Sequence, residues 1–210
     1  MIGLKGDRQV GKSRFAEYLV EEHGFRLAHP FDGGKAASRG YFMHLGAGAE
    51  MATRMTDGDL KDVPCSLLPV IVDPAHGRPG EHYRPRFFME KLARCMGVDM
   101  GSDFTLGMEM ERALRDPGPR PTGIIFSSIV FEADIFRRKG GVIIEITRRL
   151  EKDAVHGVGI ETDGFSAGIV PDMIFDNSFV TLREMRAAAD HLLYEEFRIG
   201  TPAHEPEPFA

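Results

Sequence analysis

The chain has 210 residues, of which 42% are hydrophobic and 28% are charged. These proportions belong to a globular protein rather than to a disordered or a membrane chain. The formal net charge of −6 argues against an extended footprint on nucleic acid, which needs a basic face, but leaves a local basic groove open. We expect one domain over residues 1–200 with an inserted lobe at about 35–115, and a disordered tail at 201–210.

The compartment is indicated by the absence of export signals. No apolar run approaches the roughly twenty residues that a bilayer span requires. The first residues, Met-Ile-Gly-Leu-Lys-Gly, enter an apolar stretch directly and lack the pattern of a secretory signal. Cys65 and Cys95 have no metal-ligand spacing, and such a pair is usually reduced in the cytosol. The sequence predicts a cytoplasmic protein with no membrane partner, and it leaves a homodimer open.

The first part of the chain has an alternating strand and helix pattern. Phe15, Tyr18 and Leu19 fall on one side of a helix at helical spacing, and Gly24 ends that helix. A later stretch is compatible with a helix although its glycines weaken the pattern. The expected elements are a strand at 2–5, a helix at 13–22, a strand at 25–28 and a helix at 35–52.

Prolines and glycines recur from Thr56 to Arg86, so we expect an irregular lobe over the site. The next helix has Phe88, Leu92 and Cys95 as one candidate buried line. Apolar strands then alternate with helices, which predicts a parallel sheet buried on both faces. The remaining expected elements are helices at 87–98 and 104–114, a strand at 123–126, a helix at 132–139, strands at 142–147 and 171–176, and a helix at 181–197 capped by Ser178 or Thr181.

Residues 6–13 fit the pattern G-x-x-x-x-G-K-[ST] between an apolar strand and a helix. Glycines let backbone N–H groups curl around phosphate oxygens, and a helix amino terminus adds a favourable partial positive charge. Lys12 is expected to reach the β- and γ-phosphates of ATP, and Ser13 to give Mg²⁺ a hydroxyl ligand. We predict an α/β, three-layer P-loop NTPase fold with a parallel sheet and an inserted acceptor-binding lobe. The expected ATP-binding residues of this loop are Gly6, Asp7, Arg8, Gln9, Val10, Gly11, Lys12 and Ser13.

Three further segments occur in a familiar order: Asp-Leu-Lys-Asp-Val-Pro at 59–64, Pro-Arg leading to Met-Glu-Lys-Leu at 85–92, and Pro-Asp leading to Phe-Asp-Asn at 171–177. Together with the P-loop, they resemble bacteriophage deoxynucleoside monophosphate kinases over nearly the whole chain. The resemblance implies an ATP-dependent kinase with a deoxynucleotide acceptor, located in the host cytoplasm if a phage encodes it. It also implies that Arg86 binds the acceptor phosphate and that Lys61 is a second cation in the acceptor lobe.

The chain departs from that family in two places. The family helix usually continues through Gln and a Gly-Thr-Glu-Trp-Gly-Arg run, whereas residues 90–97 read Glu-Lys-Leu-Ala-Arg-Cys-Met-Gly. The strand that often ends in Asp before an Arg-Phe pair reads Ile-Ile-Phe-Ser-Ser-Ile-Val-Phe-Glu at 124–132. Metal binding would then rest on Ser13, the triphosphate and waters, helped by Ser127 or Asp32.

These departures raise a neighbouring function as the first alternative, against which stand the net acidity and the absence of an obvious basic run. Relatives of the phage nucleotide kinases phosphorylate the 5-hydroxymethyl group of 5-hydroxymethyluracil within phage DNA, during thymidine hypermodification. Such an enzyme would keep the ATP half and change the acceptor half, and its hydroxyl acceptor would need a general base. Asp32 and Glu90 are the candidate bases, which complete a candidate catalytic set with Lys12 and Arg86. The cations that could line a local channel for DNA are Arg84, Arg86, Lys91 and Arg94.

The segment after the predicted strand at 142–147 contains candidate nucleotide contacts. Arg148 and Arg149 follow that strand at the end where nucleotide contacts gather, so one of them, with Arg148 as the candidate, is expected to contact the adenine or the triphosphate. His156 and residues 157–168 look like a flexible connection.

A non-kinase P-loop switch or ATPase is the second alternative. It is disfavoured because the sequence has no Asn-Lys-x-Asp run and no Asp at the end of the strand at 123–126.

Overall fold

The computed structural model describes residues 1–7, 9–115, 117–149, 168–179 and 181–200. Their centre is a five-stranded sheet in which every pairing is parallel, with the order β2-β3-β1-β4-β5. In this sheet Gly3 is in register with Phe126 on one side and with Ile143 on the other, so β1 lies in the middle. The strands are β1 (Ile2–Lys5), β2 (Arg26–Ala28), β3 (Ile124–Phe126), β4 (Val142–Thr147) and β5 (Met173–Asp176).

Helices cover both faces of this sheet, and the α/β prediction with a parallel sheet is confirmed. On one face, Phe15 of α1 (Lys12–His23) and Leu193 of α8 (Leu182–Phe197) share a core with Leu4. On the other face, Leu106 of α5 (Ser102–Arg115) and Phe136 of α6 (Ala133–Arg138) share a second core. The arrangement is compatible with the expected three layers.

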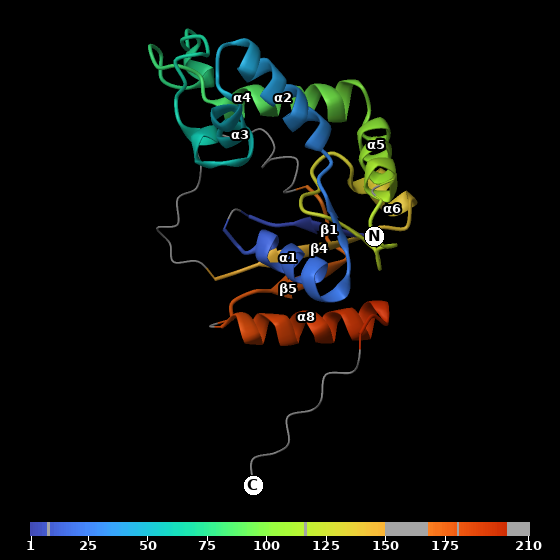
Figure 1. Cartoon of the computed structure of the whole chain (residues 1–210). Helices are drawn as coiled ribbons and strands as arrows, with labels where there is room; N and C mark the ends of the chain where they lie inside the picture. The colour runs from blue at the N-terminus through green and yellow to red at the C-terminus, as the bar shows by residue number, and fades with distance from the viewer. Residues whose placement is uncertain (8, 116, 150–167, 180, 201–210) are drawn as a thin grey trace.

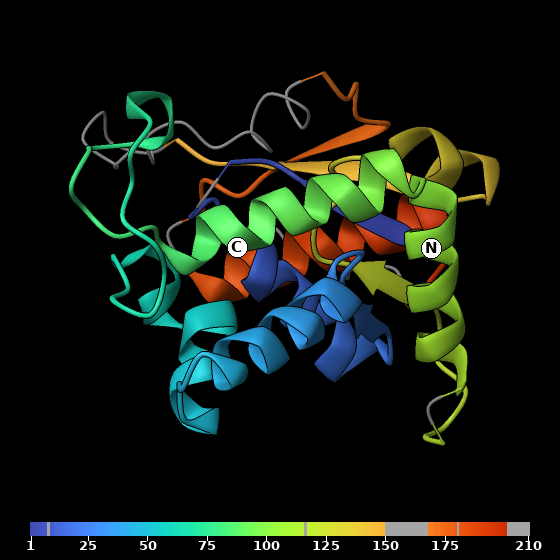
Figure 2. The same ribbon diagram turned by 90° about the horizontal axis from the view of Figure 1, so that it is seen from above.

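A separate group of helices forms between β2 and α5. It comprises α2 (Asp32–His44), α3 (Ala49–Asp57) and α4 (Pro85–Arg94), which gather at the end of the molecule away from α8 (Figure 1). Seen from above, α2 and α4 lie side by side (Figure 2), where the Phe88 ring stacks on Tyr41 at 4.7 Å and contacts Phe42 at 5.5 Å. A hydrophobic cluster around Phe42 and Met55 is distinct from the two cores of the sheet.

The segment between α3 and α4 is largely irregular, as its prolines predict. It contains 3-10 turns at Asp59–Asp62 (η1) and Pro74–His76 (η2), and an isolated antiparallel bridge joins Val70 to His82. At its far end α4 runs into a π-helical turn at Cys95–Asp99 (η3) before α5 begins.

Two predictions about the helices are wrong. The single helix expected at 35–52 is two helices, because Gly46 adopts a φ of +103° and the chain turns there. The buried line of α4 is formed by Pro85 and Met89 rather than by Phe88, Leu92 and Cys95, and Cys95 is exposed.

The ends of the other elements agree with the sequence patterns to within a few residues. Thr181 caps α8 in a capping box with Glu184, which settles the choice left open between Ser178 and Thr181. The predicted connection at 157–168, with His156, and the predicted tail at 201–210 lie outside the described residues, apart from Gly168. In the part of the chain that is described, no helix combines the length and the apolar character needed to cross a membrane.

Candidate functional site

A cavity of about 460 Å³ lies at the carboxyl ends of β1, β2 and β3. The chain leaves β1 into α1 on one face of the sheet, and it leaves the adjacent β3 toward α6 on the other. In open parallel sheets, ligands bind where such connections diverge. The polar and charged residues that line the cavity are Lys12, Ser13, His29, Lys35, Thr56, Asp57, Lys61, Arg86, Glu90, Thr105, Ser127, Ser128 and Glu132.

The loop between β1 and α1 has a backbone that only small residues permit. Gly6 and Gly11 have φ values of +129° and +100°. A Cβ at Gly6 would lie 2.2 Å from the carbonyl oxygen of Ile146, and one at Gly11 would lie 2.2 Å from Nδ2 of Asn177. The same Asn177 amide donates to the carbonyl of Val10 at 2.7 Å. The loop is therefore clamped between β4 and the end of β5, and Asn177 is a residue of the site that sequence reasoning missed.

Lys12 and Ser13 begin α1 at the edge of the cavity. The Lys12 ammonium donates to the carbonyl oxygens of Gly6 at 2.6 Å and Asp7 at 2.5 Å, so its charge is held over the loop. Gly11 is the N-cap and offers no side-chain acceptor to the first amides of α1. Gln9 is exposed, Val10 is buried, and the predicted contact of Arg8 falls on a residue outside the described ones.

This set of groups fits a phosphate chain and its magnesium ion. Phosphate oxygens are bound by backbone N–H groups, which positive-φ glycines and a helix amino terminus present, and by ammonium groups. Within the described residues, no group of three or more His, Cys, Asp or Glu side chains could hold a metal ion. The hydroxyls of Ser13, Ser127 and Ser128 line the cavity, which suits Mg²⁺ that takes most ligands from phosphates and waters.

The cations on the lobe side of the cavity are engaged by carboxylates. Arg86 binds Asp62 through both Nε–Oδ1 and Nη2–Oδ2, the second at 2.7 Å. Lys35 lies 3.0 Å from Oδ1 of Asp57. Burial raises the pKa of Asp57, but Lys35, the Thr56 hydroxyl and Arg39 together outweigh it and the net shift is downward. Lys61 lines the cavity as the sequence predicts, whereas Lys35 was not foreseen.

His29 follows β2 and lies between these cations. Its Nδ1 accepts the amide of Phe31 at 3.0 Å. Burial, and then the charge of Lys35, lower the pKa of His29 to about 4, with Lys61 adding to the effect against the opposing carboxylates of Asp32 and Asp57. The imidazole is therefore neutral at physiological pH.

The two predicted bases lie in different surroundings. Asp32 begins α2. Its Oδ2 accepts a hydrogen bond from Nη2 of Arg112 at 2.8 Å, and its Oδ1 lies 3.5 Å from Nζ of Lys35. Asp32 is not among the described residues that line the cavity. Glu90 does line the cavity, and its Oε1 is buried. The catalytic roles of both carboxylates stay predictions.

A third carboxylate in the cavity, Glu132, was not foreseen as a site residue. It ends the segment that follows β3 and is only 5% exposed. Its Oε2 accepts the backbone amides of Val130 at 3.1 Å and Phe131 at 3.0 Å. Burial raises its pKa, against the lowering effect of these amides. The sequence signal was an acidic residue at the end of an apolar run, at the carboxyl edge of the sheet.

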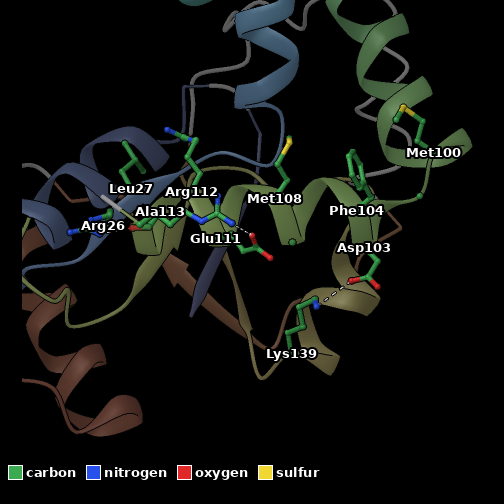
Figure 3. A pocket seen from close by; sticks show the side chains of 13 residues that line it. Arg26, Leu27, Met100, Asp103, Phe104, Met108, Glu111, Arg112, Ala113 and Lys139 are labelled. Carbon is green, nitrogen blue, oxygen red and sulfur yellow. Dashed lines mark hydrogen bonds and ion pairs between the residues drawn. The ribbon is translucent and has the colours of Figure 1, made fainter. Parts of the chain in front are cut away.

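Other predicted residues lie outside the cavity. Arg148 is exposed directly after β4, and Arg149 donates its amide to Ser178 Oγ at 2.9 Å. Arg84, Lys91 and Arg94 are exposed on α4 and its N-cap. A larger concavity of about 1150 Å³, shown in Figure 3, lies along α5 beside Arg26 and Leu27 of β2, and it contains none of the predicted site residues.

No family model matches this chain, and a search of the curated proteins also finds no match.

Proposed function

We propose that this protein is a P-loop kinase that transfers the γ-phosphoryl group of ATP to a deoxynucleotide acceptor. The observation that carries the proposal is the loop between β1 and α1, where Gly6 and Gly11 adopt positive φ and Asn177 holds the backbone at Val10 beside the cavity. Such a loop is built before the ligand binds, so the ligand need not pay for ordering it.

The donor half of the site has the parts that phosphoryl transfer needs. Lys12 already points over the loop and can exchange the carbonyls of Gly6 and Asp7 for β- and γ-phosphate oxygens. Ser13 would hold Mg²⁺, which when bound neutralises charge on the transferring group. Catalysis then consists of positioning and electrostatic stabilisation rather than covalent chemistry.

The acceptor half is formed by α2, η1 and α4. The resemblance to phage deoxynucleoside monophosphate kinases implies a monophosphate acceptor bound by Arg86 and Lys61. A specific observation favours the second candidate, a kinase for the hydroxymethyl group of 5-hydroxymethyluracil in DNA. Arg86 is already engaged by Asp62, and a carboxylate, Glu132, lies in the cavity where a phosphate acceptor would meet repulsion.

The test is transfer of ³²P from γ-labelled ATP to free deoxynucleoside monophosphates and to duplex DNA that contains thymine or 5-hydroxymethyluracil. Lys12→Ala is expected to lower turnover by about 10²-fold or more, because it removes a charge that stabilises the transition state. Lys139→Ala, whose side chain pairs with Asp103 outside the cavity, is the matched control and should keep its activity. Near-normal turnover of Lys12→Ala would refute the kinase assignment. ATP hydrolysis that needs no acceptor would instead support the switch or ATPase alternative.

A further inference from the structure

The segment from Ser127 to Glu132 joins the two halves of the site. Its start is tied to the sheet, because the Ser127 amide donates to Ala28 at 3.0 Å and the Ile129 amide donates to Leu4 at 2.9 Å. Its end lies under the lobe, since a Cβ on Gly97 of η3 would be 2.7 Å from the Phe131 ring. The segment that ends at Glu132 therefore runs from β1 to η3, the turn that continues α4.

The surroundings of Glu132 differ from those of a structural carboxylate. Within the described residues no Lys, Arg or His forms an ion pair with it, although a buried carboxylate is costly without a cation. Its two partners, the amides of Val130 and Phe131, both bind Oε2 and fix the plane of the group. Cations of the same cavity are held by other carboxylates, Arg86 by Asp62 and Lys35 by Asp57.

We propose, on the basis of the proposed kinase function, that Glu132 is the general base of the reaction and that the acceptor atom is the oxygen of an alcohol. A phosphate monoester attacks through an oxygen that has no proton to lose at neutral pH, so it needs no base. An alcohol oxygen must lose its proton as it attacks, and a positioned carboxylate accelerates that step.

The proposed reaction is a phosphoryl transfer from ATP to the alcohol oxygen. The alcohol oxygen forms a bond to the γ-phosphorus of ATP while the bond from that phosphorus to the β,γ-bridging oxygen breaks. The alcohol proton passes to Oε1 of Glu132, and ADP carries away the electron pair of the broken bond. The products are a phosphate monoester, ADP and protonated Glu132, which returns the proton to water.

The electrostatics of the cavity agree with an uncharged acceptor group. Burial raises the pKa of Glu132, which makes it a stronger base than an exposed carboxylate. An anionic acceptor group would have to separate Arg86 from Asp62, whereas an alcohol leaves that pair intact. The other charged and titratable groups that line the cavity are Lys12 of α1, His29 after β2, Lys35 of α2, Asp57 of α3, Lys61 of η1, and Arg86 and Glu90 of α4.

Glu132→Gln tests the role with little change in shape, because the Gln carbonyl can still accept the amides of Val130 and Phe131. We expect turnover on an alcohol acceptor to fall by about 10²- to 10⁴-fold. The affinity for a non-hydrolysable ATP analogue should stay within about twofold, and the Tm should not fall, because the variant removes a buried charge. The wild-type enzyme should show an acid limb in kcat/KM that the variant lacks. Asp134→Asn, on the exposed face of α6, is the matched control and should resemble the wild type.

The acceptors are chosen to separate the sources of the alcohol and the two proposals. They are thymidine, thymidine monophosphate, 5-hydroxymethyl-deoxyuridine monophosphate, and duplex DNA with 5-hydroxymethyluracil. Label on a hydroxyl of any of them, lost in Glu132→Gln, supports the inference, and the labelled compound identifies the source. Label only on the phosphate of the monophosphates would overturn the alcohol acceptor while the kinase function stands. Turnover of Glu132→Gln close to wild type, or loss of the acid limb in Glu90→Gln instead, would overturn the role of Glu132. Failure to bind the ATP analogue would overturn both proposals.

Discussion

The neutral imidazole of His29 makes a quantitative prediction about acid stability. The pKa of His29 falls from its ordinary value of 6.5 to about 4 in the folded protein. Because the folded pKa is the lower one, the unfolded chain binds a proton first as the pH falls. The full stability is present above the unfolded pKa of 6.5 and is lost progressively as the pH falls toward the folded value of about 4.

The size of the loss follows from the two pKa values. Between about pH 7.5 and about pH 5, the linkage relation gives a loss of about 2 kcal/mol from this one group. The measurement is the free energy of unfolding by urea at several pH values, for the wild type and for His29→Gln. The difference between their two curves isolates His29 from groups that titrate in the same range, such as Glu132, whose raised pKa acts in the opposite direction.

Relative to His29→Gln, the wild type should lose about 2 kcal/mol over this interval. His191→Gln changes a histidine on the exposed face of α8 and serves as the matched control, with a curve parallel to that of the wild type. If the curves of His29→Gln and the wild type were parallel as well, the burial and the cationic surroundings assigned to His29 would be refuted.

The loop between β1 and α1 and the sheet give two further predictions. Gly11→Ala should destabilise the fold by about 1–3 kcal/mol and abolish binding of ATP, because the new Cβ would meet Asn177 and the residue has a φ of +100°. The control is Gly107→Ala in α5, where nothing lies within 4 Å of the new Cβ and the change should be neutral or stabilising. Equal losses of stability for the two variants in urea unfolding would contradict the contact assigned to Asn177. Asp172→Ala should lower the free energy of unfolding by about 1–3 kcal/mol, because the Ile143 amide loses its acceptor at 2.7 Å and Arg137 loses its carboxylate partner. Asp103→Ala, which removes only the surface pair with Lys139, should cost less than about 1 kcal/mol by the same assay.

The fold was largely predictable because its signals are local. Apolar runs such as Val142–Thr147 can be buried on both faces only as strands of a parallel sheet, and β4 has those bounds. The break between α2 and α3 was missed because a helical pattern continues on both sides of Gly46, and periodicity does not reveal a backbone that turns at positive φ.

The site was most predictable where one segment contains the whole signal. The loop from Gly6 to Ser13 has its glycines, Lys and hydroxyl within one motif, so its position beside the cavity could be expected from the sequence. Asn177 contacts that loop and Glu132 lines the same cavity because the strand order places β3 and β4 on either side of β1. No spacing rule in the sequence encodes that order. Asp172, quoted for the family resemblance, ties β5 to β4 through the Ile143 amide, which is a structural role.

On the proposed kinase function, the ion pair between Arg86 and Asp62 limits the free energy that a phosphate acceptor gains by binding Arg86. A phosphate acceptor has to exchange the bidentate carboxylate for its own oxygens, so the gain is a difference between two similar charge-assisted contacts rather than the whole of one. An alcohol acceptor leaves the pair between Arg86 and Asp62 intact. It needs a group that accepts its proton, and Glu132 can be that group. On the proposed kinase function, Asp62 would favour the alcohol by lowering the affinity of Arg86 for a competing phosphate. Replacing Asp62 with Asn should shift selectivity toward monophosphates in the same ³²P assay, and an unchanged ratio of acceptors would show that Arg86 does not discriminate between them.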